Sequence, residues 1–118
     1  VIFEADGRVW VVSPSNGFGG YVNTLPKGKL DSGITLRANA LKEGYEECGL
    51  QVALTGFLCD SHRSTSVTRY YTAKRIGGHP ARMCWETQAV HLVPRAELAK
   101  FISHKNDQVI VQALRALN

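Results

Sequence analysis

The segment from Thr35 to Gly49 carries a start signal and a stop signal for one helix, and the rest of the chain must fold around that helix. Thr35 suits the N-cap, because its side-chain oxygen can accept a hydrogen bond from the free N–H groups of a first helical turn. Gly49 stands where the left-handed residue that follows a helix belongs. The sequence therefore predicts a helix from about Thr35 to Cys48.

Strand signals dominate on both sides of this helix. Asp6-Gly7 is a strong hairpin signal between two apolar runs, and Gly17–Gly20 and Pro26–Lys29 have the composition of loops. We expect strands at Val1–Glu4, Arg8–Ser13, Gln51–Cys59, Thr68–Arg75 and Trp85–Val93.

Two further helices are expected near the C-terminus. A short one should follow Pro94, and a longer one should run from about Asp107 to Leu117, where Ile110 and Leu114 recur at helical spacing. Strands with few helices indicate an α+β fold with a mixed sheet. With 118 residues, the chain is expected to form a single domain over residues 1–118. It opens at Val1 in a strand-like run, which predicts that the N-terminus has been trimmed.

The predicted helix has an apolar side and an acidic side. Ala38, Leu41, Tyr45 and Cys48 share one side and are expected to be buried. Glu43, Glu46 and Glu47 share another, where like charges repel by a few tenths of a kcal/mol, ~0.2–0.5, per pair. They also lie in the C-terminal half, where the helix dipole disfavours anions. A divalent cation would offset this repulsion, although a solvated acidic face has the same appearance.

The chain as a whole is basic, since it has 14 Lys and Arg against 10 Asp and Glu and a net charge of +4. This balance suits an anionic partner such as a phosphorylated small molecule or a nucleic acid, and it fits plain solubility equally well. Three cysteines without a CxxC pair argue against a disulfide framework and a structural zinc site. We therefore expect a cytoplasmic protein. No apolar run is long enough for a membrane span, and the oligomeric state stays open, with a dimer as one option.

The stretch from Leu25 to Leu50 resembles the Nudix box of the Nudix hydrolase family. That box is a glycine, five residues, a glutamate, seven residues, Arg-Glu, an apolar residue, any residue, Glu-Glu, any residue, Gly and a final apolar residue. Gly28 opens it and Gly49-Leu50 closes it, while Glu43, Glu46 and Glu47 match its last three glutamates without a gap. The resemblance implies a Nudix-like α/β/α sandwich with a mixed β-sheet and a loop-helix-loop metal site.

Three positions depart from the box. Ile34 stands for its first glutamate, Lys42 for its arginine, and Gly44 for the apolar residue after Arg-Glu. Lys42 keeps a positive charge beside Glu43 without the planar fork of arginine. Gly44 should weaken the helix by about 1 kcal/mol relative to alanine.

The resemblance implies a Mg²⁺- or Mn²⁺-dependent pyrophosphohydrolase that cleaves a nucleoside diphosphate linked to another group. Glu43, Glu46 and Glu47, with the backbone carbonyl of Gly28, would hold the metal. Glu43 or Glu46 would deprotonate the attacking water, and Lys42 joins these two as a catalytic residue.

Substrate-binding residues are expected around the opening glycine and on a later strand. Lys27 and Lys29 flank Gly28 and would face the phosphates, and Arg69 is a further candidate. Glu86 is a possible extra carboxylate for the metal, or simply a surface glutamate. The run from Leu25 to Gly28 is similar to that of family members acting on dinucleoside polyphosphates or diphosphoinositol polyphosphates.

Two other functions remain open. Ile34 and Lys42 also fit a catalytically weakened Nudix module that binds a nucleotide or a partner. The basic run from Arg69 to Arg82 fits an RNA 5′-end hydrolase or binder, but single-strand binders usually add several stacking aromatics. Tyr70 and Tyr71 are expected to belong to the core instead.

Overall fold

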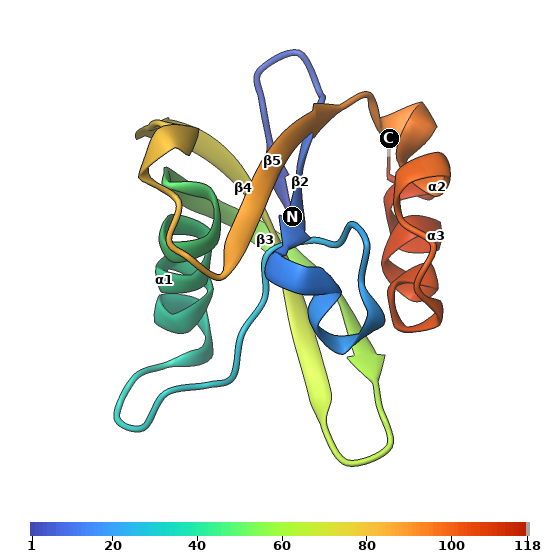
Figure 1. The fold of residues 1–118 in the computed structure, drawn as a ribbon, viewed down its shortest axis with the longest axis horizontal. Helices are drawn as coiled ribbons and strands as arrows, with labels where there is room; N and C mark the ends of the chain where they lie inside the picture. Colours follow the sequence, from blue (N-terminus) through green and yellow to red (C-terminus); the bar gives the residue numbers. More distant parts are fainter. Residues whose placement is uncertain (118) are drawn as a thin grey trace.

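Five strands form one mixed sheet in the order β3-β4-β1-β2-β5 (Figure 1). The computed structural model describes residues 1–117, apart from the side chain of Phe18. The strands are β1 (Ile2–Phe3), β2 (Val9–Pro14), β3 (Leu50–His62), β4 (Val67–Gly78) and β5 (Thr87–Val93). Strands β1 and β4 run parallel, and the other neighbours are antiparallel. The expected mixed sheet is therefore confirmed.

Helices cover both faces of the sheet (Figure 1). Helix α1 (Leu36–Cys48) lies on one side, and α2 (Leu98–Phe101) with α3 (Gln108–Arg115) lies on the other. Single 3₁₀ turns occupy Ser15–Gly20, Pro80–Arg82, Arg95–Glu97 and Lys105–Asp107. This is the α/β/α sandwich expected from the sequence. Among residues 1–117, no helix has the length and apolar character that crossing a bilayer requires.

Each face of the sheet has its own hydrophobic core. The core under α1 is built from Ile2, Trp10, Val12, Cys48, Leu50 and Ala73. The core under α3 includes Val9, Val11, Tyr70, Ile110, Val111 and Leu114. Alternate residues of β2 point into opposite cores, as the period of a strand dictates. The prediction that Tyr70 is a core residue is confirmed, and Tyr71 is buried as well.

The caps of α1 are those that the sequence predicts. The Thr35 hydroxyl accepts a hydrogen bond from Ala38 N at 3.1 Å. Gly49 follows the helix with φ 71°, in the left-handed region, and its N–H donates to Tyr45 O at 2.7 Å. The N–H of Cys84 satisfies another last-turn carbonyl, that of Glu46, at 2.7 Å. The acidic helix is thus fixed at both ends.

The side of α1 that faces the sheet is not the expected one. Leu41 and Tyr45 are 39% and 42% exposed, and the buried residues of α1 are Asn39, Gly44 and Cys48. Gly44 is the residue that meets the sheet, where a Cβ would lie 3.4 Å from Ile2 Cδ1, an ordinary van der Waals contact. The apolar periodicity of the helix therefore pointed to the wrong face.

The strand expected at Trp85–Val93 begins later than predicted. Trp85 and Glu86 lie in a turn before β5, where Thr87 N donates to Cys84 O at 3.1 Å. The Ser15 hydroxyl donates to Trp85 O at 2.6 Å, and Ser15 N donates to Glu86 O at 2.9 Å. These bonds to a neighbouring loop replace the strand ladder and leave Trp85 83% exposed.

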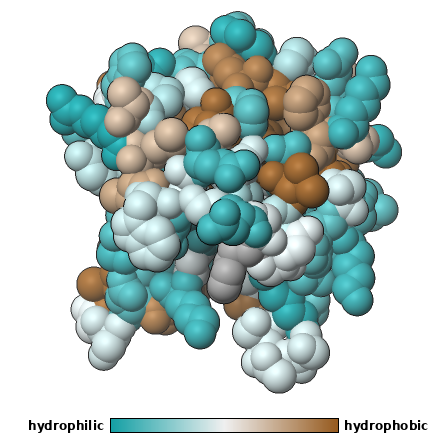
Figure 2. Space-filling model, in the orientation of Figure 1, coloured by the Kyte–Doolittle hydropathy of each residue, from teal (hydrophilic) through white to brown (hydrophobic). Residues whose placement is uncertain are grey.

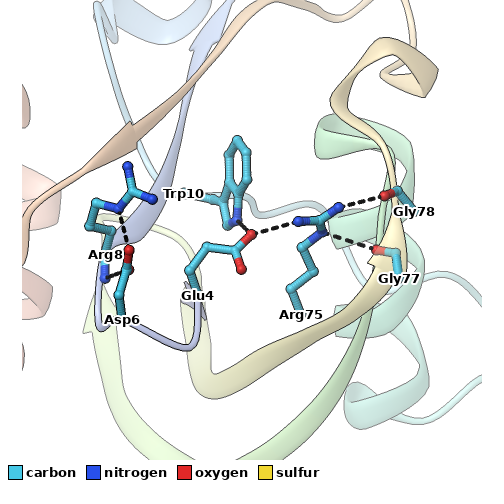
Figure 3. A network of polar contacts seen from close by, with 7 residues as sticks. All are labelled: Glu4, Asp6, Arg8, Trp10, Arg75, Gly77 and Gly78. Carbon is cyan, nitrogen blue, oxygen red and sulfur yellow. Dashed lines mark hydrogen bonds and ion pairs between the residues drawn. The ribbon is translucent and has the colours of Figure 1, made fainter.

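A polar network ties the end of β4 to the N-terminal hairpin (Figure 3). One Glu4 carboxylate oxygen accepts from Trp10 Nε1 at 3.2 Å and from Arg75 Nη1 at 2.8 Å. Arg75 Nη2 also donates to Gly78 O at 2.9 Å. In the same hairpin the side chains of Asp6 and Arg8 pair across the turn at 2.8 Å.

Figure 2 shows that hydrophobic side chains on this view gather mainly in its upper half, above a largely hydrophilic lower half.

The two backbones at the ends of α1 and β4 touch directly. A Cβ on Gly78 would lie 2.4 Å from Gly49 O, and a Cβ on Gly49 would lie 2.3 Å from His79 O. Both residues also have positive φ, of 71° for Gly49 and 80° for Gly78. His79 N donates to Gly49 O at 3.0 Å. Only glycine fits this junction, which positions the acidic helix against the sheet.

Candidate active site

A cleft of about 960 Å³ runs between α1, the loop before it and the β3–β4 hairpin. Beside it lies a smaller pocket of about 140 Å³. The smaller pocket is lined by Glu43, Glu46, Glu47, Cys84, Trp85 and Glu86. The structure thus places Glu86, a possible extra carboxylate, in the same pocket as the three helix glutamates. Glu43, Glu47 and Glu86 also line the larger cleft, so the two spaces share one acidic wall.

The loop before α1 lies directly on the carboxylates of the helix. A Cβ on Gly28 would lie 2.2 Å from the carboxylate carbon of Glu43, so that carboxylate fills the space where a side chain would be. The backbone N–H of Lys27 donates to Glu47 Oε2 at 2.9 Å. The glycine that opens the box is therefore required for the close approach of the loop to Glu43.

The carboxylates are crowded. Burial, and then the negative charge of Glu43, raises the pKa of Glu47 to about 8. Burial also raises the pKa of Glu43, against the opposing effect of the positive charge of Lys42. Without a cation, Glu47 therefore holds a proton at neutral pH. Perturbed carboxylates that line a cleft are typical of functional sites.

Lys42 takes a central place among these acids. Its Nζ lies 2.6 Å from Asp31 Oδ2, 3.1 Å from Glu46 Oε2 and 3.5 Å from Glu43 Oε1. The hydrogen bond to Asp31, followed by that to Glu46, raises the pKa of Lys42. The sequence did not indicate Asp31. Its only signal was its place three residues before Ile34, in a loop whose course the sequence leaves open.

A buried amide holds that loop in place. Asn39 Oδ1 accepts from Asp31 N at 3.1 Å, and Asn39 Nδ2 donates to Lys29 O at 3.1 Å. Asn39 is buried beneath the loop that precedes α1. Its two hydrogen bonds fix the backbone between Lys29 and Asp31, and they carry the Asp31 carboxylate to Lys42.

The donor set suits a hard divalent cation in its chemistry. Mg²⁺ prefers carboxylate and carbonyl oxygens, and the closely packed carboxylates of Glu43 and Glu47 next to the Gly28 backbone supply them. Within residues 1–117, no three His, Cys, Asp or Glu side chains surround a single point at ligand distance. Glu46 is paired with Lys42 at 3.1 Å. Glu43 and Glu47 would hold the cation beside the Gly28 backbone, with Glu46 in the same pocket.

The expected substrate-binding residues lie along the larger cleft but differ in whether an acidic side chain of the protein pairs with them. Lys27 and Lys29 line it, and Lys27 is the more buried of the two. Arg69 lines it as well, yet its guanidinium makes two hydrogen bonds to the Asp60 carboxylate, at 2.9 and 3.1 Å. The charge of Arg69 is therefore largely neutralised within the protein.

Two further residues, Arg63 and Trp85, line the larger cleft. Trp85 sits beside the acidic pocket because of the turn before β5, and Arg63 reaches the cleft from the turn between β3 and β4. Their positions depend on loops that local sequence signals do not place.

The comparisons with known proteins agree with this geometry. The family model described as NUDIX domain matches residues 1–114. No curated protein sequence matches the chain at a significant level.

Solved structures with the same fold cover nearly the whole chain. MutT of Aliivibrio salmonicida and Vibrio cholerae is 18% identical with a TM-score of 0.79, covering 100% of this chain and 92% of its own. An ADP-ribose pyrophosphatase from Streptococcus suis is 21% identical with a TM-score of 0.72, covering 98% and 85%. An Ap4A hydrolase from C. elegans is 17% identical with a TM-score of 0.73, covering 98% and 89%.

Proposed function

The chain belongs to the NUDIX hydrolase family, and from this premise we propose that it is a Mg²⁺- or Mn²⁺-dependent pyrophosphohydrolase that cleaves a nucleoside diphosphate linked to another group. One observation supports the proposal above the others. Glu43, Glu46, Glu47 and Glu86 line one pocket, and the Glu43 carboxylate fills the space left by the missing side chain of Gly28. Such an arrangement is costly unless a cation offsets it.

Each glutamate has a distinct part in the proposed reaction. Glu43 and Glu47, with the Gly28 carbonyl, would supply oxygen ligands, and Glu86 adds a carboxylate in the same pocket. When bound, the cation neutralises the diphosphate and lowers the pKa of an attacking water. Glu43 or Glu46 accepts the proton of that water.

The lysines around the acids orient the carboxylates and neutralise the negative charge of the phosphates. Lys42 holds Glu46 and Glu43 in place, with Asp31 as its own counter-ion. Lys27 and Lys29 face the phosphates from the loop before α1. Positioning and charge neutralisation of this kind account for most of the rate in phosphoryl transfer.

The free thiols of Cys48, Cys59 and Cys84 agree with the expected cytoplasmic setting.

Turnover of a substrate panel tests the proposal. The similar structures include proteins described as an Ap4A hydrolase, an ADP-ribose pyrophosphatase and a UDP-X diphosphatase. The panel therefore contains diadenosine tetraphosphate, ADP-ribose and UDP-glucose, with nucleoside triphosphates, inositol pyrophosphates and capped RNA added. We expect metal-dependent turnover of at least one, and a loss of about two orders of magnitude in Glu46→Gln and Glu47→Gln. Glu97→Gln, in an exposed pair with Lys100, is the matched control.

Absence of metal-dependent turnover on every substrate would favour the weakened binding module. Tryptophan fluorescence then gives an independent measure of metal binding. Trp85 lines the acidic pocket, whereas Trp10 is buried and bonded to Glu4. A Mg²⁺- or Mn²⁺-dependent change that Trp85→Phe abolishes would place the cation at this pocket. Turnover that is equal in wild type and both glutamine variants would refute the assignment to α1.

A further inference from the structure

Arg63 is a partly buried cation without an acidic partner. Its Nη1 donates to the Tyr21 hydroxyl at 3.2 Å and its Nη2 to the Tyr70 hydroxyl at 3.4 Å. Both partners are neutral. Its Nε is buried and makes no hydrogen bond to the described residues, and no ion pair among residues 1–117 involves Arg63. The guanidinium is held in place but its charge is not neutralised, unlike that of Arg69.

Lys27 lies against the same tyrosine. Its Nζ is 3.7 Å from the centroid of the Tyr21 ring and donates to the Thr24 hydroxyl at 2.9 Å. Lys27 Nζ and the Arg63 guanidinium therefore both contact Tyr21, one at its ring and the other at its hydroxyl. Both residues line the larger cleft.

The nearby acids do not balance these two charges. Asp107 is fully buried behind Thr24, whose hydroxyl donates to Asp107 Oδ2, and Asp107 Oδ1 has no partner among the described residues. Glu47 is the other neighbouring acid, and it accepts a hydrogen bond from the backbone N–H of Lys27 rather than from either side-chain cation. Among residues 1–117, neither Lys27 nor Arg63 therefore has a carboxylate at ion-pair distance. Uncompensated buried positive charge destabilises the folded protein unless an anion binds and balances it.

We propose that Arg63 and Lys27 form an anion-binding site for a phosphate of the substrate that lies outside the phosphate pair held at the acidic helix. The order of contacts gives this direction. The Lys27 backbone bonds Glu47, its Nζ reaches the Tyr21 ring, and the Tyr21 hydroxyl bonds Arg63. Arg63 is therefore the far end of a row that starts at the carboxylates. The site favours substrates with three or more consecutive phosphates over those with two.

Metal-free binding tests the anion site without turnover. Inorganic tripolyphosphate is titrated into the protein by calorimetry in EDTA at low salt. We expect Arg63→Gln to weaken its binding about tenfold, the loss of roughly one charge-assisted hydrogen bond. Arg115→Gln makes the same change of charge on the exposed side of α3 and should stay within about twofold of wild type. An Arg63→Gln affinity within that same range would overturn the proposal.

A second variant keeps the test valid if Arg63→Gln alters the fold, which circular dichroism would reveal. Arg63→Lys keeps the charge but cannot span both tyrosine hydroxyls, so we expect an intermediate loss of about threefold. A protein carrying Arg63→Lys that folds and binds tripolyphosphate as tightly as wild type would contradict the role given to the tyrosine-held guanidinium.

Kinetics test the position of the site, and this part rests on the proposed function. Arg63→Gln should raise KM for diadenosine tetraphosphate about tenfold while kcat and the KM for ADP-ribose change less than about twofold. Equal increases for both substrates would refute a site outside the first phosphate pair. If wild type hydrolyses no member of the substrate panel, the proposed function fails, whereas the tripolyphosphate titration still decides whether the anion site exists.

Discussion

Lys42 Nζ lies 2.6 Å from Asp31 Oδ2, so the lysine that stands in place of the box arginine has its own acidic partner. The first glutamate of the box is Ile34 here, and Ile34 is partly exposed. Asp31, three residues earlier, supplies a carboxylate in its place. The two departures from the box are therefore compensated together, which supports an active enzyme.

Removal of that carboxylate should impair catalysis through Lys42. In Asp31→Asn, Lys42 loses its shortest ion pair and holds Glu46 less firmly, so we expect kcat/KM to fall about tenfold and more metal to be needed for half-maximal rate. Asp6→Asn, which removes an acid paired with Arg8 outside the cleft, is the control. An Asp31→Asn enzyme as active as the control would show that Lys42 needs no such partner.

Gly28→Ala should abolish activity without unfolding the protein. The new Cβ would lie 2.2 Å from the Glu43 carboxylate carbon, so either the carboxylate or the loop must move. We expect a loss of metal-dependent turnover of at least about a hundredfold with a nearly unchanged melting temperature. Gly56→Ala is the matched control, because its Cβ meets only Thr72 Oγ1 at 3.4 Å. Retained activity in Gly28→Ala would mean that Glu43 is not needed where it lies.

Gly44→Ala should stabilise the protein. Alanine is the better helix former by about 1 kcal/mol, and the added Cβ would meet Ile2 Cδ1 at 3.4 Å, close to van der Waals contact. A rise in melting temperature of about 4 °C is expected from calorimetry. A fall would show that Ile2 and Val52 cannot accommodate the methyl group, and that glycine is required there for packing.

The protonation of Glu47 predicts a pH dependence of stability in EDTA. The pKa of Glu47 is raised from 4.5 to about 8 in the folded protein, so the folded state binds the proton more tightly than the unfolded one. Its contribution to stability is complete below about pH 4.5 and is lost as the pH rises through 8. Glu47→Gln should therefore melt higher than wild type at pH 8, by about 4 °C, and the gap should narrow toward pH 5.

The two melting temperatures are measured in matched buffers. If the difference between Glu47→Gln and wild type stays constant with pH, Glu47 is not the source of the pH dependence of stability. Glu97→Gln serves again as the control, since that carboxylate is exposed and should leave the dependence of the melting temperature on pH unchanged.

The cysteines should differ in reactivity. Burial raises the pKa of Cys48 to about 12, and Cys84 is exposed. Only the thiolate is alkylated, so iodoacetamide at pH 8 should label Cys84 first and leave Cys48 unlabelled in the native protein. Peptide mass spectrometry measures this. Early labelling of Cys48 would indicate that α1 detaches from the sheet in solution.

Local signals were sufficient to predict the main elements. The hydroxyl of Thr35 and the left-handed Gly49 act within their own helix, and the Asp6-Gly7 turn acts within its own hairpin, so short stretches of sequence predict all three correctly. The spacing of the glutamates on α1 likewise follows from helix geometry. The acidic side of the site could therefore be predicted from the sequence.

The misassigned features depend on tertiary contacts. Leu41 and Tyr45 were expected inside because apolar residues usually face the core, but α1 places Gly44 against the sheet and leaves both of them exposed. Asp31 reaches Lys42 only because Asn39 fixes the loop. Arg63 depends on two tyrosines, 42 and 7 residues away in the chain. No local pattern encodes such contacts.

The junction of Gly49 and Gly78 has a mechanical consequence. Two backbone segments without side chains are in contact there, and Arg75 Nη2 donates a hydrogen bond to the carbonyl of Gly78. Because no side chain lies between the two backbones, any larger residue at either position would have to separate the end of β4 from the acidic helix.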